Sequence, residues 1–161
     1  MPSELHRAYL NLGSNIQPEE NLPRAIQLLK NYGMIEGKSS VWESRAVGSD
    51  GPNFLNACIL FTTKLGANEL KKTAISQIET ELGRIRTADK NSPRTIDIDI
   101  ALFDKEPMNL KTWDYPFVIV PLAELIPDFI HPLKKEKLSQ VADEVRKNTW
   151  MIKREDVDLS C

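Results

Sequence analysis

The stretch Ser92-Pro-Arg-Thr-Ile-Asp-Ile-Asp-Ile-Ala-Leu-Phe103 alternates from Thr95 onward, and this period of two predicts a β-strand. One face of the strand is apolar and would pack on a core: Ile96, Ile98 and Ile100. The opposite face carries two carboxylates, Asp97 and Asp99, whose β-carbons lie about 6–7 Å apart at a strand rise of ~3.3 Å per residue. Because neighbouring like charges repel, we expect something to offset them, and a divalent cation is the simplest candidate.

Three arginines precede these carboxylates: Arg84, Arg86 and Arg94. The guanidinium group presents planar donors that suit phosphate oxygens. Mg²⁺ in turn is typically held by one or two carboxylates together with substrate phosphates. An Asp-x-Asp pair alone would favour a solvated strand face with a local Arg/Asp ion pair. With the arginines beside it, the segment favours nucleotide chemistry.

The composition is that of an ordinary folded domain. At 161 residues, with 41 % hydrophobic and 27 % charged residues, the chain predicts a single domain over residues 1–161. The net charge of −2 gives no electrostatic reason to expect a nucleic-acid partner. The sequence has no apolar run of about eighteen residues and no secretory leader pattern, so we expect a cytoplasmic protein without a membrane partner. We further expect a monomer that acts on small molecules.

Alternation and helical periodicity divide the chain into these expected elements: a strand over 8–13, a helix from Pro18 towards Gly33, a strand over 34–47 bent at Gly37, a strand over 54–61, a helix over 70–82, a basic loop over 84–93 and the strand over 95–103. This order predicts an α+β fold with a ferredoxin-like βαββαβ core and an antiparallel sheet over about residues 8–132. Helices on one face of that sheet would leave the other face free for ligands.

Beyond this core we expect a strand-like aromatic and β-branched stretch over 113–120, interrupted by Pro116, and a short helix from Pro121 to Leu125. A C-terminal addition follows over 133–161, with a helix over 133–145 and a tail that frays after Lys153. We expect His131 to have a structural role.

Asn56 is the one polar residue in the apolar strand over 54–61. A buried amide must find hydrogen-bond partners, so Asn56 either contacts a ligand or caps the preceding loop, and the sequence leaves both open. No G-x-x-x-x-G-K-[ST] motif and no kinase glycine-rich loop occurs, so phosphate would be held by arginines and Mg²⁺. Two histidines without a His/Cys cluster argue against zinc.

Four motifs occur in a familiar order and spacing: Leu12-Gly13-Ser14-Asn15, Phe54-Leu55-Asn56-Ala57, Gly83-Arg84-Ile85-Arg86 and Pro93-Arg94-Thr95-Ile96-Asp97-Ile98-Asp99-Ile100. Together they resemble the 6-hydroxymethyl-7,8-dihydropterin pyrophosphokinase family over about residues 8–131. The resemblance implies a ferredoxin-like core that binds ATP as co-substrate and two Mg²⁺ ions. It also implies transfer of the β,γ-diphosphate of ATP to the hydroxymethyl group of the pterin in folate biosynthesis, with release of AMP.

The resemblance implies roles for individual residues. Asp97 and Asp99 match the ligands of both magnesium ions, and Arg84 and Arg94 match arginines that meet the ATP phosphates during transfer. Nucleotide contacts are implied for Glu79, Arg86 and Ile100, the last in an adenine pocket. Pterin contacts are implied for Asn56, which would read the pterin edge, and for two walls of that pocket, Phe54 and Val47.

The chain also departs from the family pattern. Members usually have Pro-His and then an Arg shortly before a Phe that stacks on the pterin. Here Tyr115-Pro116-Phe117-Val118-Ile119-Val120-Pro121 passes straight through, several residues short, so Phe117 is either the stacking aromatic or the residue at the His position. Asn91 stands where many members carry Trp, and Ser44-Arg45 where Thr-Pro is common. Because these departures fall mostly on nucleotide contacts, we expect weaker ATP affinity or slower turnover.

The leading hypothesis is therefore a Mg²⁺-dependent pterin pyrophosphokinase. An alternative is a pterin- or nucleotide-binding relative that has lost catalysis, which the short segment around Phe117 motivates. A third hypothesis, from another class, is a ferredoxin-like regulatory or scaffold domain that binds neither ligand.

Overall fold

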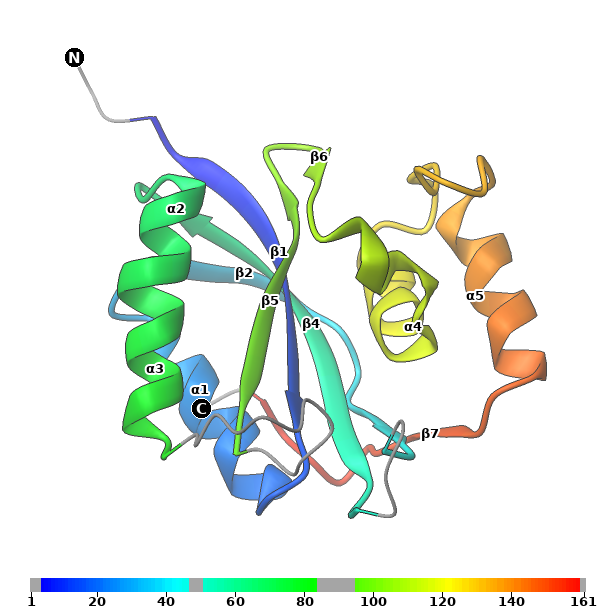
Figure 1. Cartoon of the computed structure of the whole chain (residues 1–161), viewed down its shortest axis with the longest axis horizontal. Coiled ribbons are helices and arrows are strands. Elements are labelled where there is room, and N and C mark those ends of the chain that lie inside the picture. The colour runs from blue at the N-terminus through cyan, green and yellow to red at the C-terminus, as the bar shows by residue number, and fades with distance from the viewer. Residues whose placement is uncertain (1–3, 47–50, 84–94, 160–161) are drawn as a thin grey trace.

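The computed structural model describes residues 4–46, 51–83 and 95–159 of the chain. Within these residues, seven strands form one sheet in the order β6-β5-β1-β4-β3-β7, with β2 also paired to β4 (Figure 1). The strands are β1 (His6–Ser14), β2 (Met34–Lys38), β3 (Trp42–Ser44), β4 (Phe54–Thr63), β5 (Asp97–Phe103), β6 (Glu106–Pro107) and β7 (Met151–Lys153). Each of these pairings is antiparallel. The order β5-β1-β4-β2 is that of a ferredoxin-like βαββαβ core, which confirms the predicted fold class.

Helices cover both faces of this sheet (Figure 1). One face packs against α1 (Pro18–Leu29) and a continuous helical segment made of α2 (Ala67–Glu69), the π-helical η1 (Leu70–Ile75) and α3 (Ser76–Glu81). The other face carries the 3₁₀-helix η2 (Leu110–Asp114), α4 (Pro116–Leu125) and α5 (Leu138–Lys147). The expectation of one free face is therefore wrong in part, because α4 and α5 bury the part of that face around Cys58 and Ala101.

Strand alternation decides which side each residue faces. In β1, Leu10 and Leu12 are buried against α1 and α3, and in β5 Ile98 and Ile100 join the same core. β4 is buried along almost its whole length because both of its faces are covered, which explains why its sequence is apolar without alternation. The intervening positions of β1 and β5 point to the opposite face, towards α4.

The strand expected over 34–47 is interrupted. Its described residues form β2 and β3, and the register of β2 against β4 shifts between Ile35 and Gly37, where the bend was predicted. The strand that carries the two carboxylates begins at Asp97, two residues later than predicted.

The strand-like character expected for residues 113–120 is wrong, because these residues form the end of η2 and the first half of α4. Pro116 occupies the first turn of α4, where its missing N–H costs nothing. Residues 118–123 are all buried, so tertiary burial outweighs the β-propensity of Val118-Ile119-Val120.

The helix expected over 133–145 begins later, at Leu138. Nδ1 of the buried His131 ring accepts the backbone N–H groups of Leu133 and Lys134, both at 3.1 Å, and so holds these residues in a turn. The ring nitrogen Nε2 donates to the carbonyl of Trp113 at 2.7 Å. Both ring nitrogens therefore serve the fold, in agreement with the structural role expected for His131.

The tail after Lys153 does not fray, contrary to expectation. β7 pairs with β3, Arg154 N–H donates to the carbonyl of Val41 at 2.8 Å, and Leu159 is only 6 % exposed within the core beneath α1 and α3. The C-terminal addition is thus part of the sheet and of its core. Over the described ranges, the helices are all too short or too polar to cross a lipid bilayer.

Candidate active site

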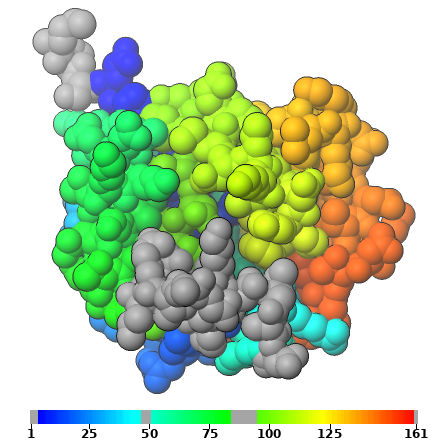
Figure 2. Space-filling view, viewed as in Figure 1, coloured from blue at the N-terminus to red at the C-terminus, as the bar shows by residue number. Residues whose placement is uncertain are grey.

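A cavity of about 310 Å³ opens where the described part of the sheet is not covered by α4. In Figure 2 the surface is hollowed between β5 and the η2–α4 segment, with atoms of β1 visible at depth. The cavity is lined by residues of six elements and their flanks: Asn11, Leu12, Gly13, Ser44, Arg45, Phe54, Asn56, Asp97, Asp99, Thr112, Tyr115, Phe117 and Val118. The predicted residues that it brings together are Phe54, Asn56, Asp97, Asp99 and Phe117.

The register of three strands places the polar groups of the cavity side by side. Gly13 on the central strand β1 is opposite Asn56 on β4 and opposite Asp97 on β5. Two residues away along β1, Asn11 is opposite Asp99. The predicted common face of the two carboxylates is confirmed in that both line the same cavity.

Gly13 explains why the carboxamide of Asn56 can lie next to the central strand. A β-carbon at Gly13 would be 3.2 Å from Oδ1 of Asn56, closer than ordinary van der Waals contact. The missing side chain therefore leaves room for the Asn56 amide over β1, on the side of Asp97.

β3 fixes the orientation of the Asn56 amide. Asn56 is 4 % exposed, and its Nδ2 donates to the carbonyl of Trp42 at 3.3 Å and to Oγ of Ser44 at 2.8 Å. Both bonds go to β3 and not to the described residues of the loop before β4, so they give no support to a loop cap. With Nδ2 engaged, Oδ1 is the atom that remains to accept a hydrogen bond from a ligand.

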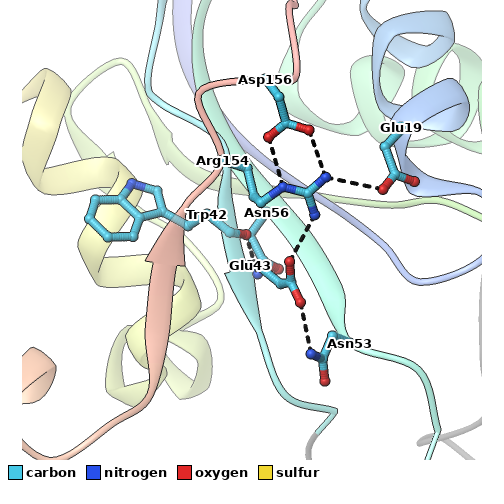
Figure 3. Close-up of polar contacts among 7 residues, drawn as sticks. All are labelled: Glu19, Trp42, Glu43, Asn53, Asn56, Arg154 and Asp156. Atoms are coloured by element: carbon cyan, nitrogen blue, oxygen red, sulfur yellow. Dashed lines mark hydrogen bonds and ion pairs between the residues drawn. The ribbon is translucent and has the colours of Figure 1, made fainter.

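β3 is in turn held by Arg154, which joins three segments that are distant in sequence (Figure 3). Its guanidinium donates to Glu43 of β3 at 2.8 Å, to both carboxylate oxygens of Asp156 at 2.8 Å and to Glu19 of α1 at 3.4 Å. Hydrogen bonds from Asn53 and then from Arg154 hold the pKa of Glu43 below its usual value. The hydrogen bonds from Arg154 lower the pKa of Asp156 to about 2.

Three aromatic side chains line the cavity: Phe54, Tyr115 and Phe117. Phe54 comes from the start of β4, and Phe117 comes from the first turn of α4. The ring of Phe117 stacks on that of Tyr115, with centroids 5.1 Å apart and planes inclined by 14°. The cavity therefore has one aromatic wall from the sheet and a second from the stacked pair of rings at the start of α4.

Two of the predicted nucleotide residues lie outside this cavity. Glu79 on α3 is 4 % exposed, and its Oε2 accepts the backbone N–H of Ile98 at 3.2 Å, on the edge of β5 that does not face β1. Ile100 is buried in the core beneath the helices, and its carbonyl accepts Nδ2 of Asn109 at 3.1 Å. Four further predicted residues lie outside the described residues: Val47, Arg84, Arg86 and Arg94, as does Asn91.

Sequence reasoning missed Asn11, Ser44 and Tyr115 as cavity residues. Asn11 had a detectable signal, because it is a polar residue between Leu10 and Leu12 in an apolar strand. Its position beside Asp99 depends on the pairing of two strands far apart in the chain, and no local pattern reports that.

Comparison with known protein families matches residues 9–127 to the family described as 7,8-dihydro-6-hydroxymethylpterin-pyrophosphokinase (HPPK). The chain belongs to this family. Membership confirms the predicted resemblance and the predicted enzyme class, an ATP-dependent pterin pyrophosphokinase of folate biosynthesis.

Curated relatives named as this pyrophosphokinase are similar in sequence to the chain over most of their length. The chain is 34 % identical over 155 residues to 2-amino-4-hydroxy-6-hydroxymethyldihydropteridine pyrophosphokinase of Synechocystis, which covers 89 % of this chain and 78 % of the relative. The enzyme of the same name from Aquifex aeolicus is 36 % identical over 146 residues, with 84 % and 90 % covered. The one from Bacillus subtilis is 35 % identical over 155 residues, with 89 % of both chains covered.

Solved structures support the HPPK fold. A crystal structure of Plasmodium falciparum HPPK-DHPS with pterin and p-hydroxybenzoate superposes with a TM-score of 0.72 at 14 % identity, covering 92 % of this chain. A second, of the A437G variant, gives a TM-score of 0.73 at 13 % identity and covers 91 % of this chain. The chain spans 43 % and 46 % of those two longer chains, so this likeness concerns the fold alone.

Proposed function

We propose that the protein transfers the β,γ-diphosphate of ATP to the hydroxymethyl group of 6-hydroxymethyl-7,8-dihydropterin, with release of AMP and in dependence on Mg²⁺. The observation that carries this proposal is the shared cavity, in which Asp97 and Asp99 lie beside Asn56 and two aromatic walls. A metal-binding pair and a pocket for a flat polar ring thus meet in one space.

The pterin would occupy the side of the cavity near Asn56. A planar ring system fits between Phe54 and Phe117, where offset stacking stabilises it. Oδ1 of Asn56 accepts an N–H of the pterin edge, and the amide cannot turn easily because Nδ2 is held by Trp42 and Ser44. We propose Val47 as a further wall of the pterin pocket.

The carboxylate pair fits Mg²⁺ better than a metal held by protein alone. In the described part of the chain, no group of three or more His, Cys, Asp or Glu side chains could hold an ion. Asp97 and Asp99 would therefore supply part of the coordination, and phosphate oxygens and water the rest, as Mg²⁺ prefers. We propose two ions; when bound, they neutralise phosphate charge and make the acceptor hydroxyl easier to deprotonate.

The nucleotide would lie along β5. We propose that Arg84 and Arg94 meet the ATP phosphates and that Arg86 contributes a nucleotide contact. Glu79 and Ile100 are retained as proposed nucleotide contacts, although Glu79 accepts the Ile98 N–H and the Ile100 carbonyl accepts Asn109 in this structure.

In the reaction, the hydroxymethyl oxygen of the pterin attacks the β-phosphorus of ATP. A new P–O bond forms there, and the bond between the β-phosphorus and the α,β-bridging oxygen breaks. The electron pair leaves with AMP, and the hydroxyl proton passes to solvent. The protein contributes alignment and charge neutralisation, which dominate phosphoryl-type transfer.

AMP formation tests this function. We expect AMP to form only when both Mg²⁺ and the hydroxymethyl-dihydropterin are present, and kcat to fall by at least ~10²-fold in Asp97→Asn and Asp99→Asn, as expected for loss of a group that stabilises transition-state charge. The melting temperatures of both variants should stay near that of the parent, because the carboxylates repel each other in the metal-free sheet. Asp114→Asn, which removes an exposed carboxylate of η2 outside the cavity, is the matched control.

Other outcomes would identify the alternatives. Pterin-independent ATP hydrolysis, or equal loss of stability and activity in both Asp variants, would contradict the proposal. Tight pterin binding without AMP formation would identify a relative that has lost catalysis. Absence of saturable binding of either ligand would identify a scaffold domain. We also propose that the protein acts in the cytoplasm as a monomer.

A further inference from the structure

Asn11 carries a buried amide that no group in the described part of the protein satisfies. It lies in the central strand β1, lines the cavity and is 9 % exposed. Neither its Nδ2 nor its Oδ1 has a hydrogen-bond partner among residues 4–46, 51–83 and 95–159. Buried polar groups without a hydrogen bond are rare and destabilise the fold, so a bound group that completes these hydrogen bonds is expected at this position.

The neighbours of Asn11 indicate what that group is. Asn11 is opposite Asp99 on β5 and opposite Cys58 on β4. Burial raises the pKa of the Cys58 thiol, so this neighbour stays neutral and behaves as a small apolar side chain. The charged cross-strand neighbour is the carboxylate of Asp99, at a β-carbon separation of ~4.5–5.5 Å.

A hydrated divalent cation matches both atoms of the amide. An amide oxygen is a hard ligand for such a cation and also accepts hydrogen bonds from its bound waters. The amide N–H group can donate to a carboxylate or phosphate oxygen beside the ion. A second residue around a metal commonly fixes the first ligands in this way, and its loss typically costs 10–100-fold in metal affinity.

We propose that Asn11 is a positioning residue of the metal site, which binds the divalent cation held at Asp97 and Asp99 directly or through one of its waters. This inference rests on the proposed function only in placing a divalent cation at these carboxylates. It predicts a trade-off, since the same amide destabilises the metal-free protein and stabilises the metal complex.

The test uses α,β-methylene-ATP, in which the bond to be broken is blocked, and Mn²⁺ as the probe ion. Calorimetry gives the affinity of the protein for the analogue with and without Mn²⁺. We call the ratio of these two affinities the metal-dependent gain. In Asn11→Leu we expect this gain to fall by roughly tenfold. The metal-free affinity for the analogue and the pterin Kd should stay within about twofold of the parent, and the melting temperature of the metal-free protein should rise because an unpaired amide is removed.

Two further variants sharpen the test. Asn11→Asp adds a carboxylate opposite Asp99, so the gain should increase while the metal-free protein loses stability through repulsion. Asn56→Ala should show the reverse pattern to Asn11→Leu, with a weaker pterin Kd and an unchanged gain.

The inference is overturned by an unchanged gain in Asn11→Leu, by no gain in the parent protein, or by a pterin Kd that changes as much as the gain. The last result would assign Asn11 to the pterin or to general packing. None of these readouts needs turnover, so a protein that binds Mn²⁺ through Asn11 but forms no AMP would refute the proposed function and leave this inference standing.

Discussion

At the centre of the sheet, the absence of a side chain at Gly13 determines where the Asn56 carboxamide lies. Gly13 leaves space that the Asn56 carboxamide occupies, and the two bonds from Nδ2 of Asn56 to β3 prevent the amide from moving aside. The glycine of the Leu12-Gly13-Ser14-Asn15 motif is therefore explained by the close approach of a neighbouring side chain and not by an unusual backbone angle.

Gly13→Ala tests this arrangement. The new β-carbon would be 3.2 Å from Oδ1 of Asn56, so the amide must shift by a few tenths of an ångström and lose alignment with the pterin. We expect the pterin Kd, measured by calorimetry, to rise roughly tenfold, which is ~1.4 kcal/mol. Gly37→Ala is the control, since its β-carbon would make an ordinary 3.5 Å contact with Leu60. Equal pterin affinity in the two variants would contradict the explanation.

Single residues also show what the sequence could predict. Period-two alternation is local, so it was sufficient to place Asp97 and Asp99 on one face and the isoleucines between and beside them on the other. The partnership of Asn11 with Asp99 required the register between β1 and β5, which neither strand encodes alone. The arginines that motivated the nucleotide hypothesis lie outside the described residues, so their roles remain predictions.

At the scale of elements, α4 builds the cavity wall that the sheet lacks. Its first turn carries Phe117, stacked on Tyr115, and its residues 118–123 are buried against β4 and α5. The sequence misled here because Val118-Ile119-Val120 favours a strand in isolation, whereas burial on all sides and Pro116 at the helix start favour a helix. Helices over 70–82 and after Pro18 were predictable because each has one apolar stripe.

Phe117→Leu isolates the contribution of the α4 wall. Leucine fills similar space but cannot stack on a flat heterocycle, and stacking on an aromatic side chain is worth ~1–3 kcal/mol. We expect the pterin KM to rise between about 5-fold and 100-fold, with little change in the KM for ATP. Phe129→Leu removes the ring that packs on Trp113 at 5.9 Å, so it should lower the melting temperature without a selective effect on pterin. If both variants change the pterin KM alike, Phe117 has only a packing role.

At the scale of the whole molecule, Arg154 connects the segment that follows β7 to the side of the cavity where Asn56 lies. Its contacts with Glu43, Asp156 and Glu19 connect β3, β7 and α1 (Figure 3). No local sequence pattern could predict this network. Glu43 and Arg154 are 111 positions apart, and the charged residues after Lys153 show no periodicity that would indicate a packed segment.

Acid titration of Arg154→Gln tests this network. The pKa values of Glu43 and Asp156 are lowered in the folded protein, that of Asp156 to about 2. For a lowered pKa, the stabilising effect is complete above the ordinary carboxyl pKa of ~4 and disappears as the pH falls through the folded value.

We expect Arg154→Gln to melt roughly 2–4 °C below the parent at pH 7, and the difference to vanish between about pH 4 and pH 2. Lys147→Gln, which removes only an exposed i,i+3 pair with Glu144, is the control and should melt like the parent throughout. A difference that persists at pH 2 would show that Arg154 acts through packing and not through its ion pairs.

The pairing of β3 with β7 has a consequence for synthesis on the ribosome. Ser44, which holds the Asn56 amide, belongs to a short strand whose outer edge pairs with residues 151–153. While a nascent chain lacks those residues, that edge is unpaired and open to chaperones or to another strand. The part of the cavity around Asn56 is therefore expected to mature only after residues 151–153 have been synthesised.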